Sequence, residues 1–206
     1  MIRVLPTNQS YAQVAEVLES GGVALVPTDT VYGLAALPSI AAAGARIFDL
    51  KGRAYDKNLP FLVDSISDIR GLGAALSPAA VRLIDSDYMP GPLTLALGFD
   101  VSLPRPTWLQ GRIEVAVRIP ADRELRWLIR RVGPLLCTSA NASGSAVLQS
   151  VDEILPTLSG EPDIVVDGGS RSSVASTLVN CRPDPPVVER EGAIPAETIL
   201  EVLRGE

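Results

Sequence analysis

The chain has 206 residues, of which 47% are hydrophobic and 20% charged, and it carries a formal net charge of −6 without any histidine. This composition excludes a disordered chain, and no apolar run reaches the roughly 18 residues of a membrane-spanning helix, so we expect a single soluble domain over residues 1–206. The acidic balance argues against diffuse binding to nucleic-acid phosphates, and the first ten residues lack the pattern of a secretion signal, so we expect a cytoplasmic protein.

Apolar segments rich in Val, Ile and Leu alternate with segments of helical periodicity, which is typical of an α/β protein. The run PDPP at 183–186 could set apart a short C-terminal arm. In chain order the sequence predicts a helix at 10–20, a strand at 23–27, a helix at 39–50 capped by Ser39, a strand at 60–63, a helix from Ser77, strands at 93–99 and 115–119, a helix at 122–132, a strand at 134–138, a capping box at Ser150 and Glu153, strands at 163–167, 176–180 and 186–190, and a last helix near Pro195.

Two early segments place polar residues beside predicted strands. In VPTDTVYGL, Thr28, Asp29 and Thr30 directly follow an apolar strand, where α/β sheets bind ligands, although an ordinary strand exit has the same composition. KGRAYDKNLP contains the only two lysines of the chain, Lys51 and Lys57, with Arg53 between them. Such a cluster of cations suits a polyphosphate, and a solvated loop after a helix is the alternative.

Three later segments also carry candidate residues. MPGPLTLAL is typical of a structural turn that leads into a strand bearing Thr94. In VAVRIP, Arg118 interrupts a core-forming pattern, so it lies either at a sheet edge or in a ligand site with a carboxylate or phosphate. LLCTSANASGSA follows a strand with small polar residues that include Ser139 and Asn141, and these form either a phosphate cradle or a plain polar turn.

Several kinds of site have no basis in the sequence. The two cysteines, Cys137 and Cys181, lack metal-ligand spacing, and without histidine there is no Ser-His or Cys-His pair. We interpret Cys137, in the apolar run PLLCT, as a buried structural thiol. No Walker P-loop and no GxGxxG fingerprint occurs, so the standard nucleotide-binding folds are not indicated.

The order of these segments resembles the YrdC-like family of threonylcarbamoyl-AMP synthases. PTDTVYGLAA, KGRAYDKNLP, PGPLT, VAVRIP, TSANASG, ASTLV and VEREGAI follow one another as in that family, from about Pro27 to Ile194. The resemblance implies a single YrdC-like α/β domain with a twisted, mostly mixed sheet, flanking helices and a concave nucleotide-binding face. It also implies the short form, without the C-terminal domain of longer members.

The resemblance implies an enzyme, a nucleotidyltransferase that makes threonylcarbamoyl-AMP and pyrophosphate from L-threonine, bicarbonate and ATP. Mg²⁺ would be bound through the ATP phosphates and not by a metal site of the protein. The expected partner is a threonylcarbamoyl-transferase complex that modifies tRNA, and direct binding of tRNA is left open. Carried over by motif, Lys51 and Arg53 would be catalytic, Thr30, Arg118 and Ser176 would bind threonine, and the ATP site would comprise Lys51, Arg53, Lys57, Thr94, Ser139, Asn141 and Arg190.

The chain departs from the family pattern at three positions. Leu62 and Asp122 stand where relatives often have histidine, and Ala54 replaces a common proline. These changes concern threonine recognition more than the ATP reaction. An RNA-binding or ribosome-assembly module of the same fold is the alternative function, and the acidic charge and the 4% aromatic content argue against it.

Overall fold

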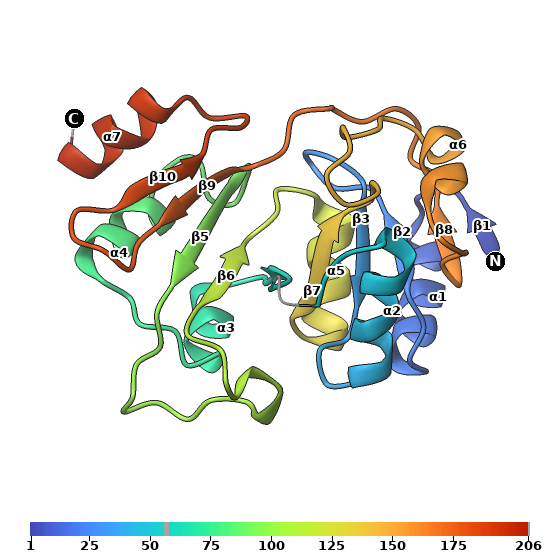
Figure 1. Cartoon of the computed structure of the whole chain (residues 1–206), viewed down its shortest axis with the longest axis horizontal. Coiled ribbons are helices and arrows are strands. Elements are labelled where there is room, and N and C mark those ends of the chain that lie inside the picture. The colour runs from blue at the N-terminus through green and yellow to red at the C-terminus, as the bar shows by residue number, and fades with distance from the viewer. Residues whose placement is uncertain (56–57, 206) are drawn as a thin grey trace.

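A ten-stranded mixed β-sheet forms the centre of the protein, as described by a computed structural model that covers residues 1–55 and 58–205 (Figure 1). The strand order is β1-β8-β2-β3-β7-β4-β6-β5-β9-β10. The strands are β1 (Ile2–Val4), β2 (Ala24–Val26), β3 (Gly33–Ala36), β4 (Phe61–Leu62), β5 (Leu93–Leu97), β6 (Val115–Arg118), β7 (Leu135–Ser139), β8 (Ile164–Val166), β9 (Thr177–Asn180) and β10 (Val187–Arg190). With the flanking helices, this sheet confirms the predicted α/β class.

Each strand predicted from the sequence is present, and the structure adds β1 and β3. Strand β3 has the sequence GLAA, whose small residues have low strand propensity, so the alternation test missed it. It pairs antiparallel with β2, with Val26 opposite Gly33, and then with β7, where Gly33 lies opposite Ser139. Residues 27–32 therefore connect two neighbouring interior strands, β2 and β3.

The first two predicted helix starts were wrong. Helix α1 begins at Asn8 because Thr7, whose Oγ1 accepts the N–H of Ser10, is its cap. Helix α2 begins at Ala41 without a side-chain cap, so Ser39 does not have the predicted role. Helix α3, with the Ser65–Asp68 capping box, was not predicted because it is only six residues long.

The later helix signals were confirmed. Ser77 caps α4, Asp122 caps α5, and Ser150 forms the expected capping box with Glu153 at α6. The helices are α1 (Asn8–Glu19), α2 (Ala41–Lys51), α3 (Ile66–Gly71), α4 (Pro78–Ile84), α5 (Arg123–Val132), α6 (Val151–Ile154) and α7 (Ala196–Arg204), with 3₁₀ turns at Thr107–Leu109 and Leu155–Thr157.

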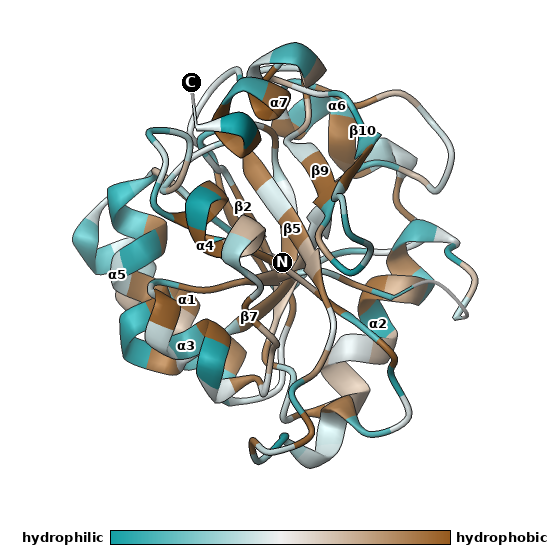
Figure 2. Ribbon diagram, turned by 90° about the vertical axis from the view of Figure 1, so that its left-hand side faces the viewer, coloured by the Kyte–Doolittle hydropathy of each residue, from teal (hydrophilic) through white to brown (hydrophobic). Residues whose placement is uncertain are grey.

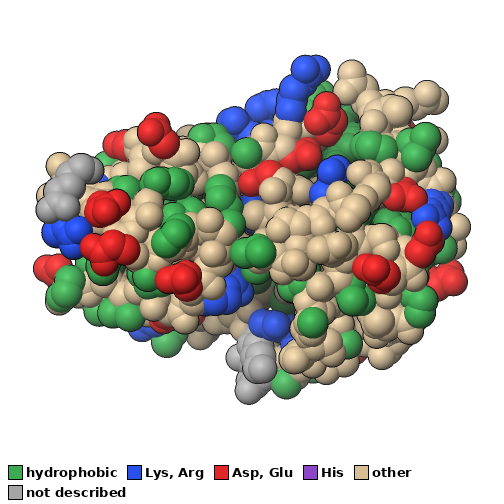
Figure 3. All heavy atoms as spheres, turned by 90° about the horizontal axis from the view of Figure 1, so that it is seen from above, with side chains coloured by type: hydrophobic (Ala, Val, Ile, Leu, Met, Phe, Trp, Pro, Cys, Tyr) green, Lys and Arg blue, Asp and Glu red, His purple; other side chains and the backbone are tan. Residues whose placement is uncertain are grey.

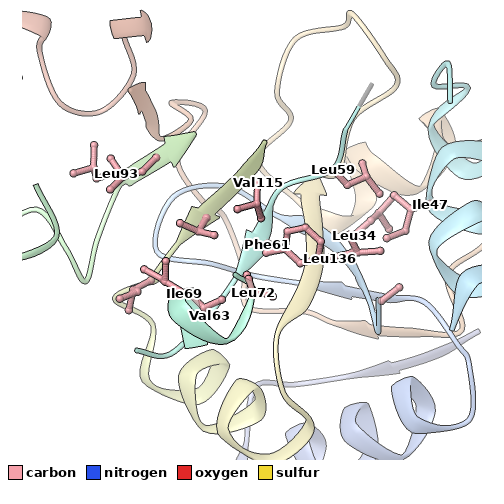
Figure 4. Close-up of a cluster of buried hydrophobic side chains, with 14 of the residues drawn as sticks. Leu34, Ile47, Leu59, Phe61, Val63, Ile69, Leu72, Leu93, Val115 and Leu136 are labelled. Carbon is pink, nitrogen blue, oxygen red and sulfur yellow. The ribbon is translucent and has the colours of Figure 1, made fainter. Parts of the chain in front are cut away.

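One face of the sheet is covered by helices along its whole width. Its buried cluster includes Leu34, Phe61 and Leu136, against which Ile47 of α2 and Ile69 of α3 pack (Figure 4). In Figure 2, helices of this face such as α3 and α4 combine teal and brown residues, as expected for amphipathic helices on a sheet. Their apolar sides supply the core.

The opposite face is covered over only part of the sheet. Its buried cluster joins α1 and α5 to the half of the sheet that ends at Leu62 of β4, and the cluster as described has no member in β5, β6, β9 or β10. On those four strands, the residues that point to this face include Ala96, Ala116 and Arg118, since side chains alternate along a strand. An uncovered, partly polar sheet surface is therefore available for a ligand.

The C-terminal segment belongs to the sheet and is not a detached arm. Strand β10 pairs antiparallel with β9, and Ile194 and Ile199 are buried in the larger core cluster. The run PDPP is thus the turn of a hairpin, which corrects the sequence interpretation. No helix in the described part of the chain is long and apolar enough to cross a membrane.

Candidate active site

A cavity of about 300 Å³ lies on the uncovered sheet face. In the view from above, Lys and Arg side chains border a hollow in the surface (Figure 3). The predicted site residues that line the cavity are Thr30, Arg53, Thr94, Arg118, Ser139, Ser176 and Arg190. The tertiary structure thus brings together residues separated by up to 160 positions in the sequence.

Arg118 lies at the end of β6 and is held on three sides. Its side chain is buried, Nε donates to the carbonyl of Gly91 at 2.9 Å, and Nη1 donates to Thr30 Oγ1 at 2.7 Å. Nη2 lies 2.7 Å from Asp29 Oδ1, but without hydrogen-bond geometry, so it has no hydrogen-bond partner among the described residues. The guanidinium is therefore fixed in place and keeps donor capacity for a ligand.

The position of Arg118 resolves the two sequence alternatives. Strand β6 lies between β4 and β5, so the residue is not at a sheet edge. The carboxylate expected beside a buried guanidinium is Asp29, which the sequence analysis noted but did not assign to the site. Gly91, in the predicted structural turn PGP, supplies the third contact.

A second polar group is formed by Thr94, Ser176 and Arg190. The hydroxyls of Thr94 and Ser176 lie 2.7 Å apart and are buried. Arg190 donates from Nη2 to the carbonyl of Ser176 at 2.8 Å, and burial lowers its pKa, with a further contribution from the charge of Arg118. The residues predicted for threonine and for ATP are therefore direct neighbours, so one ligand could contact both sets.

Thr177 holds this second group in place. It is fully buried, and its Oγ1 accepts the N–H groups of Gly192 and Ile194 and donates to the carbonyl of Ile194. Gly192 has no room for a side chain, because a Cβ would collide with the backbone of Ala175 and Ser176. This close approach brings the end of β10, with Arg190, against Ser176.

Lys51 and Asn141 lie beside the cavity without lining it. Lys51 Nζ donates to the carbonyls of Ser139 and Asn141, the latter at 2.6 Å. Burial lowers the pKa of Lys51 to about 8, and the charge of Arg53 contributes to the shift. Asn141 Nδ2 donates to the carbonyl of Ser145 at 2.6 Å, and its buried Oδ1 has no partner among the described residues.

The segment KGRAYDKNLP also contains Gly52, Arg53 and Lys57. Arg53 lines the cavity, and its Nη2 donates to the carbonyl of Asn58 at 3.1 Å. Helix α2 ends at Lys51, and its cap, Gly52, has a left-handed conformation with φ 57°, which glycine adopts without strain. Lys57 lies outside the described residues.

Two of the three positions that depart from the family pattern, Leu62 and Asp122, lie in different places. Leu62 lines the cavity and pairs with Arg118, so it places an apolar wall beside the guanidinium. Asp122 caps α5 and is not part of the cavity wall as described, and burial raises its pKa. Cys137 also lines the cavity, but it is buried, and desolvation raises its pKa to about 12, which agrees with an unreactive thiol.

Two acidic residues of the wall were not predicted. Glu114 forms an ion pair with Arg182 at 2.5 Å, and Glu189 accepts a hydrogen bond from Asn180 at 2.7 Å. No sequence motif marked them: Glu114 lies just before β6, and Glu189 lies within β10. Among the described residues, no group of three or more His, Cys, Asp or Glu side chains could hold a metal ion.

Comparison with known proteins identifies similar chains along most of the sequence. A family model for Sua5, YciO and YrdC proteins, described as "Telomere recombination", matches residues 16–192. A threonylcarbamoyl-AMP synthase from Pyrococcus abyssi is 33% identical over 188 residues, which are 90% of this chain and 55% of that protein. A threonylcarbamoyl-AMP synthase from Bacillus subtilis is 34% identical over 202 residues, 97% of this chain and 58% of that protein. The chain thus spans little more than half the length of these relatives.

The fold comparison agrees with the sequence comparison. A crystal structure of P. abyssi Sua5 in complex with L-threonine is similar to this structure, with a TM-score of 0.84 and 32% sequence identity. The match covers 98% of this chain and 60% of that one. The similarity therefore includes all the strands that carry the cavity.

Proposed function

The chain belongs to the Sua5/YciO/YrdC family, and from this premise we propose that it is an L-threonylcarbamoyladenylate synthase. In this proposal it is a nucleotidyltransferase that converts L-threonine, bicarbonate and ATP into threonylcarbamoyl-AMP and pyrophosphate. The curated relatives that carry the name of this activity, at 33% and 34% identity, support the proposal.

The observation that carries the proposal is the buried guanidinium of Arg118 in the cavity. Its Nη2 lies 2.7 Å from Asp29 Oδ1 without hydrogen-bond geometry, so it can still donate to a ligand, and a carboxylate is the group that a planar guanidinium binds best. Thr30 orients Arg118 through Nη1, and Ser176 lies on the same cavity wall. These three residues are the proposed site for the carboxylate and amine of threonine.

The nucleotide would lie across the rest of the cavity. Arg53 and Ser139 line one part of the wall and are proposed for the triphosphate together with Asn141 and Lys57. Lys51 lies behind this wall and is bonded to the loop that carries Ser139 and Asn141. Arg190 and Thr94 adjoin Ser176 and are proposed for the α-phosphate and nucleoside. The α-phosphorus would then lie close to the amine of threonine.

The chemistry needs positioning and charge neutralisation more than a dedicated base. The amine of threonine attacks bicarbonate and gives a carbamate with loss of water. A carbamate oxygen then attacks the α-phosphorus, and the bond to the β-phosphate oxygen breaks as pyrophosphate leaves. Fixed arginines and hydroxyls stabilise the developing charges without reorganisation, which is how a site without histidine can accelerate this reaction.

Mg²⁺ is proposed to bind together with ATP. The described residues include no carboxylate cluster for it, and Asp29 is engaged with Arg118, so the phosphate oxygens are its natural ligands. When bound, the ion would neutralise phosphate charge. The adenylate product would pass to a threonylcarbamoyl-transferase complex that modifies tRNA.

The test is release of pyrophosphate by the purified protein with ATP, bicarbonate and Mg²⁺. We expect release only when L-threonine is added, together with a product of the mass of threonylcarbamoyl-AMP. Arg118→Lys should raise the KM for threonine by about tenfold or more, because one donor to the carboxylate is lost. The exposed Arg123→Lys is the matched control. Pyrophosphate release that does not depend on threonine would overturn the proposal.

A further inference from the structure

Lys51 has an unusual setting for a residue that would bind a phosphate. It is only 3% exposed and is not part of the cavity wall as described, whereas Arg53, two residues later, is. Both acceptors that the structure shows for its ammonium group are backbone carbonyls, those of Ser139 and Asn141. The side chain is thus directed at the backbone of the next loop.

The backbone of Lys51 binds the same loop. Its carbonyl accepts the N–H of Ser143 at 3.0 Å, so one residue makes three hydrogen bonds to the loop that we define as residues 139–143. The preceding residue, Leu50, binds a different segment, because its carbonyl accepts the N–H of Ser159. The end of α2 therefore fixes the course of the chain after β7.

This arrangement carries a cost that structural stability alone does not require. An ammonium group held by neutral carbonyls is desolvated without a counter-charge. The charged or titratable groups that face it are Arg53 and Cys137, and Arg53 repels it. A neutral side chain would avoid that cost but would leave both carbonyls without this donor.

The loop that Lys51 holds carries two proposed ATP-binding residues. Ser139 lines the cavity, and Asn141 has a buried Oδ1 without a partner among the described residues. Both side chains depend on the backbone to which Lys51 is bonded. A shift of about 1 Å in such a loop is enough to lower catalysis strongly.

We propose that Lys51 is a positioning residue: it holds the 139–143 loop in the conformation that presents Ser139 and Asn141 to the nucleotide, and it does not contact the phosphates itself. The proposal rests on the proposed function for the identity of the ligand. It gives Lys51 and Arg53 different roles, because Arg53 faces the cavity and Lys51 faces the loop.

The first test needs no substrate, so it stays informative even if the proposed function fails. Amide hydrogen exchange is measured on the nucleotide-free protein for peptides that cover residues 138–145. Lys51→Met keeps the length of the side chain and removes the donors, and we expect exchange there to rise by about tenfold or more. Arg53→Ala is the matched control and should leave exchange in this loop unchanged. Unchanged exchange in Lys51→Met would overturn the proposal.

The second test separates a positioning role from phosphate binding. Ser143→Pro removes the N–H that bonds to the Lys51 carbonyl and leaves the lysine side chain intact. If Lys51 acts through the loop, the ratio between the change in kcat and the change in the KM for ATP should be the same in Lys51→Met and in Ser143→Pro. In Arg53→Ala this ratio should differ. If Ser143→Pro loosens the loop but keeps full activity, the proposal fails.

The third test is rescue by a conservative variant. Lys51→Arg keeps the charge, but its planar fork is larger and differs in shape from an ammonium group that is 3% exposed and bonded to two carbonyls. We expect Lys51→Arg to restore neither loop protection nor activity. Full activity in Lys51→Arg would assign the residue to phosphate binding, since charge alone would then be sufficient.

Discussion

The ion pair between Arg118 and Asp29 allows a sharp test of the site. Asp29→Asn keeps the shape of the side chain and removes the counter-charge of a guanidinium whose side chain is 8% exposed, while that of Asp29 is 15% exposed. Breaking a buried pair from one side costs about 3 kcal/mol, because the other charge stays buried. For a chain of this length, that corresponds to a melting temperature lower by about 6–12 °C.

The chain offers a matched control at the same distance. Arg3 and Asp152 also lie 2.7 Å apart, but their side chains are 41% and 78% exposed. Water screens such a pair, so Asp152→Asn should leave the melting temperature almost unchanged. Thermal unfolding of the two variants and the parent protein is the assay. Equal melting temperatures for Asp29→Asn and Asp152→Asn would refute the argument that burial makes the Arg118 pair important.

The same thermal unfolding experiment, repeated with L-threonine, tests whether Arg118 binds the carboxylate of the ligand. If the carboxylate of L-threonine binds Arg118, it supplies the charge that Asp29→Asn lacks. Threonine should then raise the melting temperature of Asp29→Asn more than that of the parent protein. At a threonine concentration of a hundred times Kd, binding stabilises the folded protein by about 2.7 kcal/mol. An equal shift in both proteins would place the carboxylate elsewhere.

Two further predictions concern stability. The pKa of Lys51 is lowered to about 8, against 10.5 in the unfolded chain, so between these pH values the unfolded state binds more protons than the folded state. As the pH rises from 8 to 10.5, the free energy of unfolding of the parent protein should therefore increase by about 3 kcal/mol relative to that of Lys51→Met. Urea unfolding at several pH values measures this difference, and a constant difference would contradict it. Thr94→Val should lower the free energy of unfolding by about 1–2 kcal/mol, because Ser176 loses its buried partner, whereas Thr107→Val at an exposed position should not. Equal urea midpoints for these two variants would argue against a role for the hydroxyl pair.

The sequence determined the fold class and most of its elements. Runs of Val, Ile and Leu are typical of buried strands, so the longer strands were predictable from local pattern alone. Caps such as Ser77 and Ser150 act within one turn of helix and were equally visible. Strand β3 was not, since the small residues of GLAA become a strand only between β2 and β7.

The sequence also identified most of the cavity residues by their motifs, but not what each of them contacts. Asp29 was visible as a polar residue next to Thr30, yet its ion pair with Arg118 spans 89 positions of the chain and arises only where β6 meets the β2–β3 connection. Glu114 and Glu189 gave no local signal at all.

Lys51 shows most clearly which properties follow from the sequence and which follow only from the tertiary structure. The sequence placed it in a cation cluster that suits phosphate, and its residue type and spacing support no finer statement. Only the tertiary structure decided that its ammonium meets the carbonyls of Ser139 and Asn141, while Arg53 lines the cavity. Local pattern determines which elements form, because helix and strand periodicity depend on neighbours in the chain. The direction of a long, flexible side chain depends on which acceptors the packing of distant elements places within its reach.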